Sequence, residues 1–239
     1  MRGDVLVLAG TAEARALLAR CGGLRVTASL AGATDSPRDL GVPTRRGGFG
    51  GAEGFRAALA LHSAVLDATH PFASTISTRT ATICAARAVP YLRLTRAPWP
   101  TEPGWIRHAD ATACAEALPA GARVLLTAGP GALDPFLGRG LDLTCRRVDP
   151  APARAGVDWV IGTPPFTERD EAALMRDRAI THLVTKNSGG SRAKLDAARR
   201  LGVSVHVIDR PPPPPGDETH DIDRAYAFIL AHADHRRAG

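Results

Sequence analysis

The chain has 239 residues, of which 44% are hydrophobic and 23% charged, and its formal net charge is +6. This composition is that of an ordinary globular protein and excludes a disordered chain, while no apolar run approaches the ~18 residues of a membrane span. At roughly 100–200 residues per domain, the length allows one large domain or two small ones.

Almost all the positive charge comes from arginine, since Lys186 and Lys194 are the only lysines in the sequence. Two explanations stay open. One is codon bias in an alanine-rich chain, and the other is an anionic ligand, because guanidinium groups pair with carboxylates and phosphates. The arginines are dispersed and aromatic residues make up 5% of the chain, so we expect no nucleic-acid partner.

The four cysteines are widely spaced, with no Cys-x-x-Cys pair and no cysteine–histidine cluster along the sequence; they are Cys21, Cys84, Cys114 and Cys145. This pattern predicts small core residues in a reducing cytoplasm, and neither disulfides nor metal ligands. Residues 1–4 lack a signal-peptide pattern. We therefore expect a cytoplasmic protein without a membrane partner.

Short apolar runs alternate along the chain with alanine-rich amphipathic segments. Strands are predicted over residues 5–9, 24–30, 64–68, 90–94, 123–128, 144–148, 159–161, 182–185 and 203–208. Helices are predicted over residues 12–20, 54–62, 74–88, 111–118, 168–178, 191–201 and 219–233. Strands with few polar residues, separated by helices, predict parallel sheets covered on both faces, as in a doubly wound α/β architecture.

Three prolines within residues 97–104 interrupt this alternation. Each side of the break has about the size of a half-Rossmann unit. We therefore predict two Rossmann-like domains, residues 1–100 and 101–239, with a cleft between them. The proline run 211–215 is predicted to be a rigid spacer before the last helix.

The first predicted strand runs directly into Gly10 and Thr11 and then into a helix. A helix that begins there presents backbone N–H groups to one point, which suits a phosphate. The simpler alternative is that Thr11 is an ordinary helix N-cap.

A dinucleotide site usually has a carboxylate about 20 residues after the first glycine, where it holds the ribose. Here the corresponding segment begins at Ser29 and has no carboxylate until Asp35. Three arginines follow, Arg38, Arg45 and Arg46. Small and hydroxyl residues with arginines nearby favour a 2′-phosphate, and therefore NADP over NAD.

The third apolar run ends in D-A-T-H-P-F-A, residues 67–73. Ligands of open α/β sheets bind outside the carboxyl ends of strands, where Thr69, His70 and Pro71 would lie. A histidine there can bind an anion or transfer a proton near neutral pH. Alternatively, His70 is a turn histidine.

In the second half, T-A-G-P-G at residues 127–131 repeats the pattern of a strand, a glycine and a helix. Residues 162–167 are better explained as a helix-capping segment than as a binding site. The strongest signal is K-N-S-G-G at residues 186–190, where backbone donors can surround an anion and Lys186 supplies charge. The alternative is an incidental surface lysine.

Together these segments resemble the precorrin-6A reductase family of cobalamin biosynthesis over nearly the whole chain. The motifs are G-T-x-E from residue 10, R-G-G-F at 46–49, D-A-T-H-P-F-A at 67–73, Y-L-R-L-x-R-x-P-W at 91–99, R-V-D-P at 147–150, P-F-T-x-x-x-E at 165–171, K-N-S-G-G at 186–190 and K-L-D-A-A-R at 194–199. Two departures are Ala9, where the family usually has glycine, and Pro130, where it frequently has arginine.

The resemblance implies an NADPH-dependent reduction of one double bond of the precorrin-6A macrocycle, giving precorrin-6B, with cofactor and tetrapyrrole between two Rossmann-like domains. No metal is required for that step. His70 and Lys186 are the candidate catalytic residues, and Arg93, Arg96 and Arg147 are candidates for the substrate carboxylates. The candidate cofactor-binding residues are Gly10, Thr11, Glu13, Ser29, Arg46, Thr69, His70, Pro71, Asn187, Ser188, Gly189 and Gly190.

Three alternatives stay open. The chain could act on the cobalt-loaded precorrin of the anaerobic route with NADH, or it could be a non-catalytic module that senses a nucleotide or tetrapyrrole. It could also be a nucleotide-sugar enzyme, since fold alone does not set function. Neighbouring pathway enzymes are further candidate partners.

Overall fold

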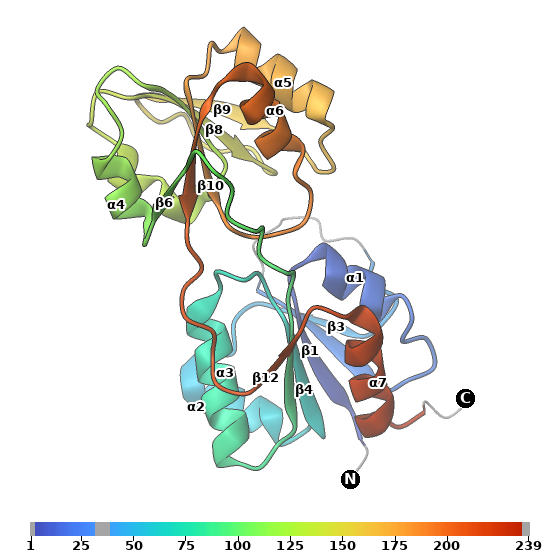
Figure 1. The fold of residues 1–239 in the computed structure, drawn as a ribbon. Helices are drawn as coiled ribbons and strands as arrows, with labels where there is room; N and C mark the ends of the chain where they lie inside the picture. The colour runs from blue at the N-terminus through green and yellow to red at the C-terminus, as the bar shows by residue number, and fades with distance from the viewer. Residues whose placement is uncertain (1–2, 32–38, 236–239) are drawn as a thin grey trace. The chain divides into compact units, whose positions relative to one another are not determined.

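The computed structural model describes residues 3–31 and 39–235, so Asp35 and Arg38 lie outside the described residues. The chain forms two compact units (Figure 1): unit 1 is Met1–Ala97 with Pro211–Gly239, and unit 2 is Pro98–Arg210. The predicted second domain, residues 101–239, differs from this division. The chain returns to unit 1 after Arg210, where it supplies β12 (Asp217–Thr219) and α7 (Ile222–His232).

Unit 1 is built on a six-stranded parallel sheet. Its remaining strands are β1 (Val5–Ala9), β2 (Val26–Leu30), β3 (Thr44–Arg46), β4 (Ala64–Ala68) and β5 (Tyr91–Leu94). The strand order is β3-β2-β1-β4-β5-β12, which is the Rossmann order 3-2-1-4-5-6. The direction of winding reverses between β1 and β4, the place where such sheets bind ligands.

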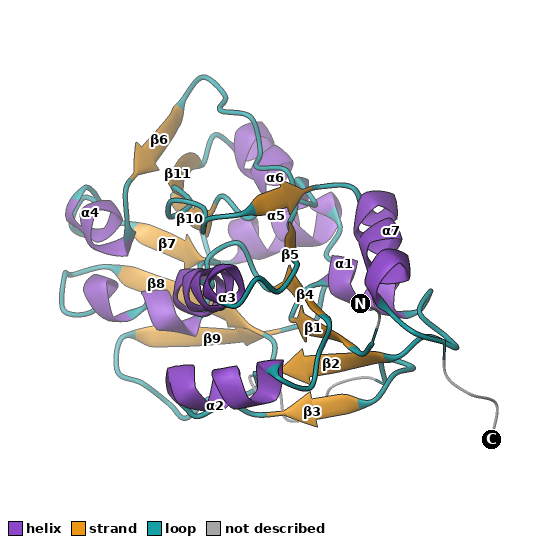
Figure 2. Ribbon diagram, turned by 90° about the horizontal axis from the view of Figure 1, so that it is seen from below, coloured by secondary structure: helices purple, strands orange, loops and turns teal. Residues whose placement is uncertain are grey.

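Helices cover both faces of this sheet, which explains why every residue of β1 is buried. Val5 and Val7 pack with α1 (Ala12–Leu18) and α7, and Figure 2 shows these two helices side by side. Leu6 and Leu8 point to the other face, where they share a core with α2 (Gly51–Leu59) and α3 (Ser74–Ala86). The alternation follows from the two-residue period of a strand.

Unit 2 repeats this design. Its strands are β6 (Trp105–His108), β7 (Arg123–Leu126), β8 (Asp142–Arg147), β9 (Val157–Ile161), β10 (His182–Lys186) and β11 (Ser204–Ile208). All pairs are parallel, in the order β9-β8-β7-β10-β11-β6, so the winding reverses between β7 and β10. The helices are α4 (Ala111–Glu116), α5 (Glu168–Asp177) and α6 (Ala193–Leu201).

The predicted α/β class and the parallel sheets are confirmed, and each predicted strand and helix overlaps one in the structure. The sequence prediction missed β3, β6 and β12, which are edge strands of three or four residues with few buried side chains. Such strands lack the continuous apolar run that marks a central strand. Among the described residues, no helix has both the length and the apolar character needed to cross a membrane.

Candidate functional site

The loops that follow β1 and β4 meet at the reversal point of unit 1. The Thr11 hydroxyl donates to the Ala68 carbonyl at 3.1 Å and accepts from the Ala14 amide at 3.1 Å, so it joins the two loops and caps α1. Gly10 is exposed beside it, and a Cβ added there would lie 3.9 Å from the Cα of Thr69. The structure thus brings Gly10, Thr11 and Thr69 together at the end of the sheet.

A buried carboxylate, that of Asp67, supports the loop after β4. Its Oδ1 accepts hydrogen bonds from the Thr69 amide at 3.1 Å and hydroxyl at 2.7 Å, and its Oδ2 accepts from the Tyr91 hydroxyl at 3.0 Å. Burial first, and then the charge of Asp67, raise the pKa of Tyr91. Tyr91 therefore stays protonated and serves as a donor that fixes the loop.

His70 is half-buried on the same loop, and the backbone holds its ring. The Phe72 amide donates to His70 Nδ1 at 3.2 Å, so in the neutral imidazole the proton lies on Nε2. Pro71 is buried, and its carbonyl accepts from Arg93 at 3.3 Å. Arg93 is 5% exposed and pairs with Glu218 at 2.9 Å, an arrangement that favours holding the loop over meeting a substrate carboxylate.

Glu13 and Arg96, predicted to bind cofactor and substrate respectively, bind each other. The Arg96 Nε donates to Glu13 Oε1 at 2.7 Å, and both side chains are about one-quarter exposed. Burial alone would raise the pKa of Glu13, but the hydrogen bond and charge of Arg96, together with hydrogen bonds from the backbone and Thr11, outweigh it and lower that pKa. Within unit 1, the pair joins the first turn of α1 to the segment that follows β5.

The carboxyl ends of β2 and β3 carry the residues that predicted a 2′-phosphate site. Ser29 is buried and accepts a hydrogen bond from Arg45 at 2.8 Å, and the Arg45 guanidinium stacks 3.8 Å over the Phe49 ring. Arg46 is exposed and pairs in register with Leu30, the last residue of β2. Its guanidinium makes no hydrogen bond or ion pair with the residues that the structure describes.

In unit 2 the K-N-S-G-G loop follows β10 at the second reversal point. The Asn187 side chain is paired with the backbone of Trp99, accepting from its amide at 2.8 Å and donating to its carbonyl at 3.2 Å. The Trp99 indole donates to the Gly190 carbonyl at 2.9 Å. Gly189 and Gly190 have φ values of 70° and 81°, which glycine adopts without strain. Asn187 therefore shapes the loop with its side chain.

Lys186 is the last residue of β10 and is half-buried. Burial lowers the pKa of its ammonium group. The Ser188 amide donates to the Lys186 carbonyl at 2.7 Å, so the chain turns sharply after the lysine. Lys186 and Ser188 thus lie at the carboxyl edge of the sheet.

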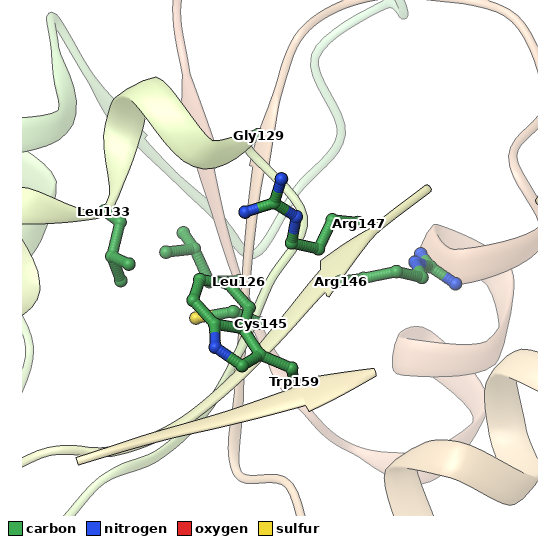
Figure 3. A pocket seen from close by; sticks show the side chains of 7 residues that line it. All are labelled: Leu126, Gly129, Leu133, Cys145, Arg146, Arg147 and Trp159. Carbon is green, nitrogen blue, oxygen red and sulfur yellow. The ribbon is translucent and has the colours of Figure 1, made fainter. Parts of the chain in front are cut away.

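Arg147 ends β8 and lines a small hollow. Its neighbours there are Leu126, Gly129, Leu133, Cys145, Arg146 and Trp159. The Arg147 Nε donates to the Asp149 carbonyl at 2.8 Å, and its guanidinium lies 5.4 Å from the centre of the Trp159 ring. Figure 3 shows Arg146 pointing elsewhere, and it pairs with Glu171 at 2.9 Å. The hollow, about 10 Å³, has room for roughly one water molecule, so it is no pocket for a macrocycle.

The sequence prediction also missed a cluster on the far strands of unit 2. His108, Cys114 and His206 are buried, with ligand atoms within 4.8 Å of one another. The sequence shows no cysteine–histidine cluster, but in the fold β6, α4 and β11 bring these three residues together. Burial, with the charges of His108 and His182, lowers the pKa of His206 to about 4, and burial raises that of Cys114 to about 12.

The chain is similar over most of its length to proteins named as precorrin-6A reductases. A family model described as precorrin-6x reductase CbiJ/CobK matches residues 4–230. A precorrin-6A reductase from Rhodococcus erythropolis is 43% identical, covering 94% of this chain and 96% of that protein. A cobalt-precorrin-6A reductase from Synechocystis is 32% identical, covering 70% and 71%. A solved structure of CobK precorrin-6A reductase is 37% identical with a TM-score of 0.89, covering 96% and 97%.

Proposed function

This chain belongs to the precorrin-6x reductase family, and from that premise we propose that it reduces one double bond of precorrin-6A with NADPH, giving precorrin-6B in cobalamin biosynthesis. The observation that carries the proposal is the reversal point of unit 1. There, Gly10 and Thr11 precede α1 and lie against Thr69 in a sheet of Rossmann order. In such sheets the pyrophosphate of a dinucleotide binds at this helix N-terminus.

The residues at this point fit a dinucleotide. Gly10 is exposed and carries no side chain, so a phosphate can approach the backbone closely. Thr11 presents the first amides of α1, and the side chains of Asp67 and Tyr91 hold the Thr69–His70 loop in place. The bound nicotinamide would supply a hydride.

Arg46 supports the choice of NADPH. It is an exposed cation at the end of β3, directly beside the end of β2, where the ribose of a Rossmann cofactor lies. A 2′-phosphate would gain charge-assisted hydrogen bonds from it, and Ser29 with Arg45 would form the floor of that corner.

The substrate is a macrocycle with acetate and propionate carboxylates, so cations suit it. Arg147 and Lys186 lie at the carboxyl edge of the unit 2 sheet, and we propose that they bind such groups. Reduction adds a hydride to one carbon of the double bond and a proton to its neighbour, with NADP⁺ as the second product. We propose His70 as the proton donor in its imidazolium form, which gives the Nε2 proton to the substrate carbon. The neutral ring is held by the Phe72 amide, which donates to Nδ1.

The direct test is to mix the purified protein with precorrin-6A and NADPH and follow the ultraviolet absorbance of the reduced nicotinamide. An enzyme consumes NADPH in proportion to substrate, whereas a sensor binds both without consumption, which would overturn the proposal. A nucleotide-sugar enzyme would bind a nucleotide sugar and no corrinoid.

Cobalt-precorrin-6A is the second candidate substrate, because relatives named cobalt-precorrin-6A reductase are 28–32% identical to this chain. Relatives named precorrin-6A reductase are 38–43% identical, which favours the metal-free macrocycle. Comparing kcat/KM for the two macrocycles, each with NADPH and NADH, decides between them. We also propose a cytoplasmic location, supported by the four buried free cysteines, and neighbouring pathway enzymes as partners.

A further inference from the structure

Unit 2 contains a buried group of imidazoles and a thiol at the β6 edge of its sheet, where β6 pairs with β11. His108 ends β6, the edge strand, and His206 lies in the middle of β11 beside it. Cys114 comes from α4, which packs on both strands. Two strands and a helix thus bring two imidazoles and a thiol, groups that commonly bind metal ions, close together.

The geometry within the cluster is close. His108 Nε2 and His206 Nδ1 are 3.0 Å apart, and the two rings are stacked with an interplanar angle of 4°. The candidate ligand atoms of His108, Cys114 and His206 all lie within 4.8 Å of one another. A tetrahedral metal with bonds of about 2.0–2.3 Å holds its ligands roughly 3.5 Å apart, so the widest separation must shrink by about 1 Å. Rotation of the side chains can supply that change.

One atom of the cluster lacks the partner that burial normally requires. The His206 side chain is 2% exposed, and its Nε2 has no hydrogen-bond partner among the described residues. Buried polar atoms are nearly always paired, so this unpaired nitrogen of His206, whose Nδ1 faces His108, suggests an absent ligand. An apolar residue at position 206 would pack against α4 without this cost.

We propose that His108, Cys114 and His206 form a metal site for a borderline-soft divalent cation of the Zn²⁺ type. Two imidazoles and one thiolate are the donor set that such ions prefer over Mg²⁺ or Ca²⁺. Binding replaces the thiol proton with the metal, so one proton leaves for each ion bound. His182 follows on β10, with its ring 5.4 Å from that of His206, and is a candidate for the fourth position.

The site would be structural. Helix α4 has six residues, a length at which a helix depends on tertiary contacts for its stability. A metal would fasten the helix to β6 and β11 at once. The proposed metal site is independent of the reductase activity, since none of its residues belongs to the proposed cofactor or substrate sites.

The test uses Co²⁺ as a spectroscopic probe of the full-length, reduced protein. We expect one Co²⁺ per chain, with a sulfur-to-cobalt charge-transfer band that added Zn²⁺ abolishes. C114A should lose the band and bind Co²⁺ at least about tenfold more weakly. C84A, which removes a buried cysteine of unit 1, is the matched control and should behave as wild type.

A second variant covers the case in which C114A fails to fold. H108Q changes a residue at the end of the edge strand, and it should weaken Co²⁺ binding without changing the circular dichroism of the metal-free protein. Zn²⁺ should raise the unfolding temperature of wild type and of C84A, but not of H108Q. Absence of the charge-transfer band in wild type, or equal Co²⁺ affinity in wild type and H108Q, would overturn the proposal.

Discussion

The Thr11 hydroxyl lies 3.1 Å from the Ala68 carbonyl and donates a hydrogen bond to it, joining the start of α1 to the end of β4. Unit 2 has an equivalent contact, because the Thr127 hydroxyl donates to the Val184 carbonyl at 3.1 Å and joins β7 to β10. In each unit a threonine just after a central strand therefore closes the reversal point. The first of these threonines also caps a helix, α1, and is the one that we propose lies at the cofactor site.

Replacing Thr11 by valine keeps the shape of the side chain and removes the hydroxyl. The variant loses the helix cap and leaves the Ala68 carbonyl without its donor, so we expect a loss of about 1–2 kcal/mol in the free energy of unfolding. NADPH binding should weaken as well. Urea denaturation and an NADPH titration measure the two effects. Thr11→Ser keeps the hydroxyl and should stay close to wild type in both; equal damage in the serine variant would contradict this role.

Arg46→Gln removes the exposed cation at the end of β3. If Arg46 binds the 2′-phosphate, KM for NADPH should rise by about 10–100-fold, the equivalent of one charge-assisted hydrogen bond, while KM for NADH stays unchanged. Arg25→Gln is the matched control, since Arg25 is also exposed but precedes β2 at the opposite end of the sheet. An equal rise for both cofactors would assign Arg46 a different role.

The Glu13–Arg96 pair predicts a specific pH dependence of stability. Because Arg96 helps to lower the pKa of Glu13 below 4.5, the pair stabilises the fold above that pH and the benefit is lost as pH falls through the lowered pKa. Arg96→Met should therefore cost about 1–2 kcal/mol at pH 7 and progressively less below pH 4.5. Unfolding curves across this pH range test it. If Arg96→Met lowers the free energy of unfolding by the same amount at every pH, the Glu13–Arg96 pair is not the source of the loss.

His70→Asn separates the two roles of the histidine. An asparagine oxygen can accept the Phe72 amide in place of Nδ1, so the loop is preserved while the acid is lost. Single-turnover reduction with bound NADPH should fall by about 10²–10⁴-fold in both His70→Asn and His70→Ala. Rescue of the rate by asparagine would make His70 a positioning residue. Lys186→Met in the same assay tests the other candidate donor.

The sequence predicted the positions of the loops better than their internal contacts. Gly10, the 67–73 segment and the 186–190 segment each follow a buried strand, and local composition marks the ends of such strands. Strand order then places the first two beside each other in unit 1. The same reasoning chose Arg46 as a candidate but gave no sign that Arg45 binds Ser29.

Contacts between distant residues lay beyond prediction. Arg93 pairs with Glu218 because the chain returns to unit 1 after the proline run and adds β12 next to β5. Asn187 pairs with Trp99, although the two residues are 88 positions apart in the sequence. Nothing near Cys114 in the sequence indicates that His206 will lie beside it, since that contact depends on α4 packing on β11.

The measurement that tests the account most directly is NADPH affinity in Gly10→Ala. Gly10 has a φ that alanine can adopt, and the added methyl would meet nothing closer than 3.9 Å, so the unfolding temperature should not change. That methyl would nevertheless occupy the place where we propose that a phosphate approaches the backbone. We predict that Kd for NADPH rises at least about tenfold, while Gly22→Ala, at an open exposed position, leaves it unchanged. An unchanged Kd in Gly10→Ala would contradict a dinucleotide site at the β1–β4 reversal point.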